Sequence, residues 1–284
     1  MALAACANGK LLASGPAGSW GVASFRTVDI WDPMSGQHKH SLTGHTDVVR
    51  ALTALPDGKL ASGSHDMTIW IWDVATGACE RTLRGHAGTV NTLAGCAWGR
   101  LASGSDDCTI KIWGVATGVC ERTLHGHVAN VWALAALPDG TLASGSGDGT
   151  IKIWNIDTGV SERTLRGHSD AVMALVSCAG GRLASSSYDG TIKLWDAARG
   201  GCERTMKGDG YGVCALAARP DDKLASGANN GIIRIWDLAT GRCEHTLRES
   251  DAPTARHESV RALESLRGGE LASGAGVITI WDSV

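Results

Sequence analysis

Seven tryptophans recur at a nearly constant spacing along this chain of 284 residues. Successive members of the series lie 41 residues apart, except the last two, which lie 45 apart: Trp31, Trp72, Trp113, Trp154, Trp195, Trp236 and Trp281. Each follows Ile or Leu, and five of them precede Asp. A residue that returns at a fixed period of this length predicts an architecture of repeated structural units.

Each repeat contains four short runs of residues typical of strands, separated by turns. In the second repeat, from residue 48 onward, the runs are VVRALTAL, KLASGS, MTIWIWD and CERTLRG. A Leu-Ala-Ser triplet precedes every tryptophan of the series, and Gly-His follows the fourth run in four repeats. Short runs with β-branched or alternating apolar residues predict strands. Their spacing leaves no room for helices, which excludes a parallel α/β fold.

This pattern, from Gly-His to Trp-Asp with a period near 41 residues, resembles the WD-repeat family over essentially the whole chain. The resemblance implies an all-β fold, a seven-bladed β-propeller of four-stranded antiparallel blades. Stacking the blades around an axis covers the two apolar faces that a lone blade would expose. We expect a single domain, residues 1–284, with blades at approximately 1–43, 44–84, 85–125, 126–166, 167–207, 208–248 and 249–284.

The first and last repeats raise the question of how the ring closes. The chain begins in the first run of the first repeat, near Leu3, and ends just after the third run of the seventh, at Trp281-Asp282-Ser283-Val284. We therefore expect a three-stranded last blade and closure by face packing alone. The alternative is a longer chain whose neighbouring residues supply the missing strand. An open edge there would invite strand pairing with a partner.

The resemblance also implies that the repeated polar residues are structural. In WD-repeat proteins a Trp N–H, a Ser hydroxyl, a His and a turn Asp form a hydrogen-bonded chain, and each set here is matched in donors and acceptors. The sets are His45, Ser62, Asp66 and Trp72; His86, Ser103, Asp107 and Trp113; His127, Ser144, Asp148 and Trp154; and His168, Ser185, Asp189 and Trp195. Ser, His and Asp also form catalytic triads, but four identical copies predict a structural role and no enzyme activity.

Functional residues are expected where the repeats differ from one another. In WD-repeat proteins the contact residues commonly follow the first-strand Val or precede the turn Asp, on the face that carries the Gly-His turns. The first set here is Arg50, Asn91, Trp132, Met173, Cys214 and Arg261, and the second is His65, Asp106, Gly147, Tyr188 and Asn229. Two insertions on the same face, 16–26 with Trp20 and 249–256, are either irregular loops or a lip for a partner.

Trp132 and Tyr188 are the expected anchors, because large aromatic residues near an interface centre carry much of the binding energy. Tyr188 stands in Ser-Ser-Ser-Tyr-Asp-Gly, which is similar to the arginine-reading channel of some chromatin-associated WD-repeat scaffolds. With Asp106 nearby, we expect a peptide ligand containing Arg or Lys. The alternative is that Trp132 fills the channel as core. Trp98, in a turn on the opposite face, is a candidate for a second contact.

Composition excludes several other classes of function. The net charge of −3 lacks the basic surplus of a nucleic-acid binder. No apolar run approaches the ~18 residues that would cross a bilayer, and no secretory signal is present. Nine cysteines, an odd number, indicate reduced thiols in the cytoplasm or nucleus. No metal-ligand spacing and no phosphate-binding loop occur, so we expect neither metal nor cofactor.

The sequence therefore predicts a monomeric scaffold that binds other proteins or peptides on one face. Two alternatives remain at this stage. The chain is a docking or substrate-recruiting domain of a larger signalling or ubiquitin-ligase chain, or it is an enzyme with a site in the central channel. The enzyme alternative has few candidate residues outside the repeated sets, namely Asp106, His65 and Tyr188.

Overall fold

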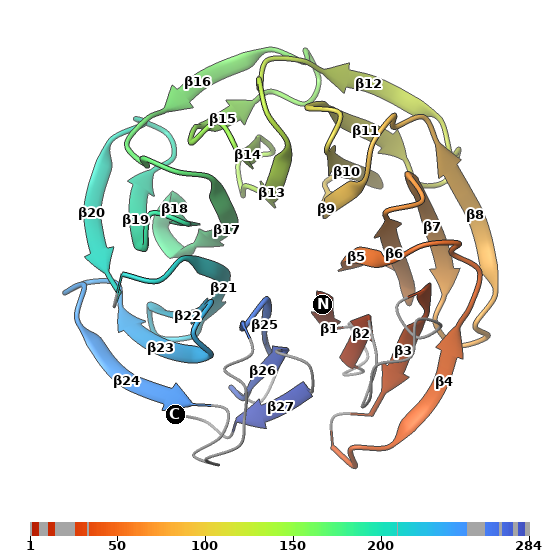
Figure 1. The fold of residues 1–284 in the computed structure, drawn as a ribbon. Helices are drawn as coiled ribbons and strands as arrows, with labels where there is room; N and C mark the ends of the chain where they lie inside the picture. The colour runs from red at the N-terminus through yellow and green to blue at the C-terminus, as the bar shows by residue number, and fades with distance from the viewer. Residues whose placement is uncertain are drawn as a thin grey trace.

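Antiparallel β-sheets follow one another around a central axis in the computed structural model of the protein (Figure 1). The structure describes residues 2–5, 11–14, 26–32, 34–208, 210–248, 259–266, 269–274 and 278–281. Side chains of 11–14 lie outside this description. The described residues form six four-stranded sheets, here called blades 1 to 6 in chain order, and one three-stranded sheet. The predicted all-β propeller with four-stranded antiparallel blades is confirmed.

The strands of each sheet run in chain order from the axis to the rim. The innermost strands are β1 (Ala2–Ala5), β5 (Val49–Ala54), β9 (Val90–Cys96), β13 (Val131–Ala136), β17 (Val172–Cys178), β21 (Val213–Arg219) and β25 (Ala262–Ser265). The second strands are β2 (Leu11–Ser14), β6 (Lys59–Ser64), β10 (Arg100–Ser105), β14 (Leu142–Ser146), β18 (Arg182–Ser187), β22 (Lys223–Ala228) and β26 (Leu271–Gly274).

The outer half of each sheet is equally regular. The third strands are β3 (Val28–Trp31), β7 (Thr68–Asp73), β11 (Ile110–Gly114), β15 (Ile151–Trp154), β19 (Thr191–Asp196), β23 (Ile232–Asp237) and β27 (Ile278–Trp281). The rim strands are β4 (His38–Leu42), β8 (Cys79–Arg84), β12 (Cys120–Leu124), β16 (Ser161–Leu165), β20 (Cys202–Lys207) and β24 (Cys243–Arg248). A short 3₁₀ turn, η2 (Ala179–Gly181), connects β17 to β18.

The tryptophan series lies at the contacts between blades. Trp113 on β11 is 1% exposed and packs with Ile69, Ile71 and Leu83 of the preceding blade. Trp154 repeats this arrangement one blade further on, against Ile110 and Leu124. The period of the sequence therefore marks one large aromatic side chain for each contact between neighbouring sheets, which explains why Trp recurs while other aromatic residues are scarce.

Glycines on the second strands set the distance between blades. A Cβ atom at Gly145 on β14 would lie 2.5 Å from Cγ1 of Val172 on the next blade. The equivalent pair, Gly104 and Val131, would be separated by 2.6 Å. Cβ atoms do not approach other carbon atoms so closely, so the small residue is required for the faces to meet.

The three-stranded sheet β25–β27 lies between blade 6 and blade 1. On one side Val260 and Leu263 pack with Ala215 and Ala225 of blade 6. On the other side Leu3 of β1 packs with Ala262 and Ala272. A hydrogen bond also joins the Ala5 backbone to the Glu264 carboxylate across this contact. Face packing therefore connects the first and last described sheets.

Candidate functional site

Each predicted set of Trp, Ser, His and Asp is brought together as a hydrogen-bonded chain. In blade 3, Trp113 Nε1 donates to Ser103 Oγ over 2.8 Å, and Ser103 Oγ lies 2.7 Å from His86 Nε2. His86 Nδ1 lies 2.8 Å from Asp107 Oδ2. The same contacts occur in the other three sets, those of Trp72, Trp154 and Trp195.

The four aspartates carry the charge of these chains. Burial alone would raise the pKa of Asp107, but hydrogen bonds from Thr109, the Ala87 N–H and His86 outweigh it and lower that pKa to about 2. Burial lowers the pKa of His86 despite the opposite effect of Asp107. At neutral pH the pair is therefore a neutral histidine that donates to a carboxylate.

These chains have the residue types of a hydrolase triad but not its accessibility. The hydroxyl-bearing residues Ser62, Ser103, Ser144 and Ser185 are all 0% exposed. A nucleophile must reach the substrate, and each of these hydroxyls is enclosed between sheets and already engaged by a tryptophan N–H. The arrangement connects the strands of a blade to its Gly-His turn.

Blade 6 and the three-stranded sheet keep only part of this set of hydrogen-bonded side chains. Trp236 Nε1 donates to Ser226 Oγ over 2.8 Å, and Trp281 Nε1 donates to Ser273 Oγ over 2.9 Å. In blade 6, Asn230 Oδ1 accepts from the Ile232 N–H in the position that the turn Asp takes elsewhere.

The varied residues of the innermost strands are the bulged residues of those strands. In blade 2, Val49 pairs with Ser64 and Ala51 pairs with Gly63, so Arg50 has no partner in the ladder. Asn91, Trp132, Met173 and Cys214 occupy the same bulge in blades 3 to 6. A β-bulge re-aims the extra side chain. The bulge therefore accounts for the direction of Arg50 and Trp132, whose side chains meet although they belong to different blades.

Arg50 of blade 2 reaches a side chain of blade 4. Its guanidinium carbon lies 5.8 Å from the centre of the Trp132 ring, a cation–π distance. Both side chains are half-buried. On its other side, Trp132 Nε1 lies within 3.4 Å of where a Cβ at Gly147 would stand, so glycine there leaves room for the indole.

Asp106 is held by two amides. Asn91 Nδ2 and Asn130 Nδ2 each donate to Asp106 Oδ1 over 2.7 Å. Asn130 was not among the residues singled out from the sequence, because it lies in the loop before β13 rather than at a varied strand position. The signal that could have found it is a side-chain amide at a position where the equivalent repeats have Val48, Thr89 and Ala171.

The remaining predicted residues continue around the same opening. Tyr188 is 44% exposed and packs over Gly212, where a Cβ would lie 2.5 Å from its ring. Cys214 Sγ donates to Asn229 Oδ1 over 2.9 Å. His65 and Met173 are half-buried, and Arg261 is exposed at the start of β25. Trp20 and the insertions 16–25 and 249–256 lie outside the described residues.

Two arginines set the electrostatics of the opening. Burial, and then the neighbouring charge of Arg261, lower the pKa of Arg50, while Asp106 acts in the opposite direction. Among the described residues, neither Arg50 nor Arg261 makes a salt bridge. We call Arg50, Asp106, Trp132, Tyr188 and Arg261 the channel mouth. This surface contains two cations, two aromatic rings and one carboxylate.

The described part of the chain contains no group of three or more His, Cys, Asp or Glu residues placed to hold a metal ion. None of its helices has the length and apolar character required to span a bilayer. Its eight cysteines are free thiols.

The stacked sheets, the buried polar chains and the varied channel mouth define a repeat-built β-propeller. The sequence profile of the family described as "WD domain, G-beta repeat" matches residues 36–73, 77–114, 118–155, 159–196 and 200–237. These matches cover more than half of the chain, which therefore belongs to the WD40 family. Proteins of this family generally act as protein-interaction scaffolds. No curated protein matches the chain.

Proposed function

We propose that this propeller binds partner proteins at the channel mouth, through an acidic segment placed between Arg50 and Arg261. The observation that carries the proposal is the pair of arginines without salt bridges among the described residues, flanked by Trp132 and Tyr188. A carboxylate would receive charge-assisted hydrogen bonds there, and the rings would supply apolar contact area.

A basic ligand, expected from the sequence, is the alternative. A basic ligand would use the Trp132 ring and the Asp106 carboxylate, and both already contact other side chains of this protein. Arg50 lies over Trp132, and both Asn91 and Asn130 donate to Asp106. An incoming Arg or Lys would have to displace Arg50 and would meet the like charge of Arg261, which disfavours its binding.

The test compares two fluorescein-labelled peptides by anisotropy, one rich in Glu and one rich in Lys and Arg. We expect the acidic peptide to bind the wild type and to lose at least tenfold in affinity for the double variant R50Q/R261Q. The matched control is R84Q, which removes one exposed arginine at the end of β8. Binding of the basic peptide alone, or equal losses for R84Q and R50Q/R261Q, would contradict the proposal.

The three-stranded sheet is included in this functional unit. We infer that it serves as a partial seventh blade and that residues 1–284 form one domain, since its two faces pack on blade 6 and blade 1. Arg261 then stands next to Arg50 on the ring through blade 1. The docking or substrate-recruiting role within a larger chain uses the same channel mouth and is compatible with this proposal.

A further inference from the structure

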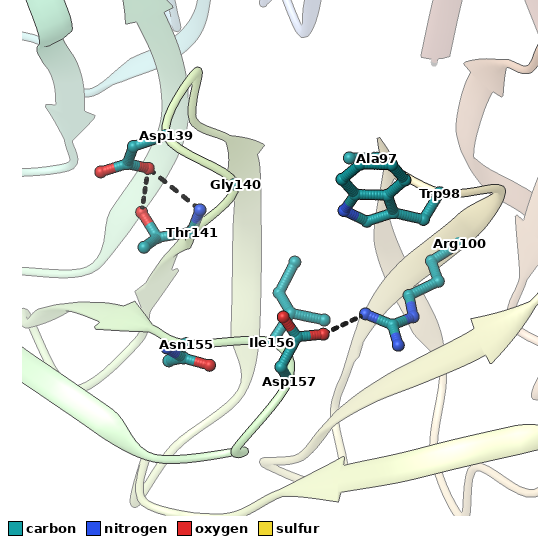
Figure 2. Close-up of a pocket in the computed structure, with 9 residues that line it drawn as sticks. All are labelled: Ala97, Trp98, Arg100, Asp139, Gly140, Thr141, Asn155, Ile156 and Asp157. Carbon is teal, nitrogen blue, oxygen red and sulfur yellow. Dashed lines mark hydrogen bonds and ion pairs between the residues drawn. The ribbon is translucent and has the colours of Figure 1, made fainter.

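A hollow lies on the face opposite the Gly-His turns, between blade 3 and blade 4. It measures about 140 Å³ and is lined by Ala97, Trp98, Arg100, Asp139, Asp157 and their neighbours. Figure 2 shows Trp98 and Arg100 on one side of the hollow, Asp139 and Thr141 on the other, and Asp157 between them. A space of this size admits the end of a long side chain.

Two residues of this hollow depart from the repeat. At the position of Trp98, blades 2, 4, 5 and 6 have Asp57, Asp139, Gly180 and Asp221. At the position of Asp157, blades 2, 3, 5 and 6 have alanine: Ala75, Ala116, Ala198 and Ala239. The two departures come from different blades and meet in one hollow, although nothing in the repeat requires either residue.

Trp98 is presented to solvent. Its side chain is 88% exposed, and the turn holds it at a φ of +62°. Trp113, Trp154 and Trp195, by contrast, are at most 2% exposed. The indole of Trp98 therefore offers a free aromatic face beside the hollow rather than contributing to the core.

The charges around the hollow are predominantly negative. Arg100 donates to Glu121 over 2.9 Å and to Asp157 over 2.6 Å, so one guanidinium is shared by two carboxylates. Asp139 uses one oxygen to accept from the Thr141 N–H and hydroxyl. Three carboxylates against one guanidinium leave a surplus of negative charge next to the exposed indole.

We propose that this hollow binds an arginine side chain in a basic segment of a partner protein. A planar guanidinium stacks on an indole face and pairs with carboxylates. It therefore fits the combination of Trp98, Asp139 and Asp157 better than a compact ammonium group does. The site lies on the face opposite the channel mouth and is independent of it.

The test uses a fluorescein-labelled peptide in which arginine alternates with glycine, and its lysine counterpart. We expect W98N to weaken binding of the arginine peptide at least tenfold and D139N at least threefold. Asn at 98 keeps the left-handed turn, and Asn at 139 keeps the acceptor for Thr141. D57N is the matched control, because it removes an acid from the equivalent turn of blade 2, where no tryptophan is present.

The indole N–H signal of Trp98, assigned through W98N in a ¹H–¹⁵N spectrum, should shift on addition of the arginine peptide. R50Q/R261Q should bind this peptide as the wild type does, which separates this site from the channel mouth. Equal affinities of wild type and W98N would overturn the proposal. An equal loss in D57N, or equal binding of the lysine peptide, would also overturn it, because either result indicates attraction by charge alone.

Discussion

One serine hydroxyl in each of blades 2 to 5 decides which nitrogen of a histidine carries the proton. Ser103 Oγ accepts from Trp113 and therefore has its single hydrogen left for His86 Nε2, so Nδ1–H must face Asp107. The sequence predicts these four sets through its resemblance to WD-repeat proteins, carried onto positions that repeat along the chain. It was not sufficient to predict Arg50 on Trp132, because that contact joins blades 2 and 4 and leaves no periodic signal.

Trp98 gives a prediction at the residue scale. A tryptophan at positive φ costs about 1 kcal/mol, whereas Asn and Asp tolerate this conformation because their short polar side chains bond to the local backbone. W98N should therefore raise the free energy of unfolding by about 1 kcal/mol, measured by urea denaturation. The reverse substitution D57W, at a φ of +59°, should lower it by a similar amount. A stability loss in W98N would mean that the indole makes contacts that support the turn.

The element that carries the varied residues is the bulge in the innermost strand of blades 2 to 6. The resemblance to WD-repeat proteins, together with varied residues after a repeated Val, selects Arg50, Asn91, Trp132, Met173 and Cys214 from the sequence. The sequence does not show the bulge itself, because every copy contains the same extra residue and the period of the chain is unchanged. The direction of these side chains is therefore a property of strand pairing rather than of local composition.

The contact between the sheets of neighbouring blades depends on Gly145 opposite Val172. G145A would place a methyl group 2.5 Å from Val172 and should destabilise the protein by about 1–3 kcal/mol through overpacking. V172A removes the opposing branches, so the double variant G145A/V172A should recover part of the loss. Chemical denaturation of the two single variants and the double variant measures this coupling. Strictly additive effects would show that the two residues do not limit the distance between blades.

For the whole molecule, the contact between the three-stranded sheet and blade 1 contains a half-buried acid, Glu264. Burial raises the pKa of Glu264 to about 7, although the hydrogen bond from the Ala5 backbone acts to lower it. Because the folded-state pKa is raised above the unfolded value of 4.5, the favourable contribution is present below that value and is lost as the pH rises to about 7.

E264Q removes this titration without removing the side chain. At pH 8 the variant should be more stable than the wild type, by up to about 3 kcal/mol, and at pH 4 the two should be similar. Thermal unfolding of both proteins across this range measures the difference. A difference that does not change with pH would show that Glu264 is ionised or hydrated at every pH tested.

The ring as a whole presents two different faces. One face has two arginines and two aromatic rings at the channel mouth, and the other has a tryptophan beside surplus carboxylates. The ring could be predicted from the repeated residues. The residues that differ between repeats distinguish its two faces. The sign of charge at each face could not be predicted, because it depends on which charged groups of separate blades pair with one another.

Selection from a random peptide library displayed on phage tests the central claim most directly, since no ligand is assumed. Wild-type protein should enrich sequences containing Asp or Glu, and R50Q/R261Q should lose that enrichment while R84Q keeps it. Enrichment of the same acidic sequences by R50Q/R261Q would contradict binding at the channel mouth. Enrichment of Arg- and Lys-containing sequences that depends on Tyr188 and Asp106 would contradict the proposed charge of the ligand.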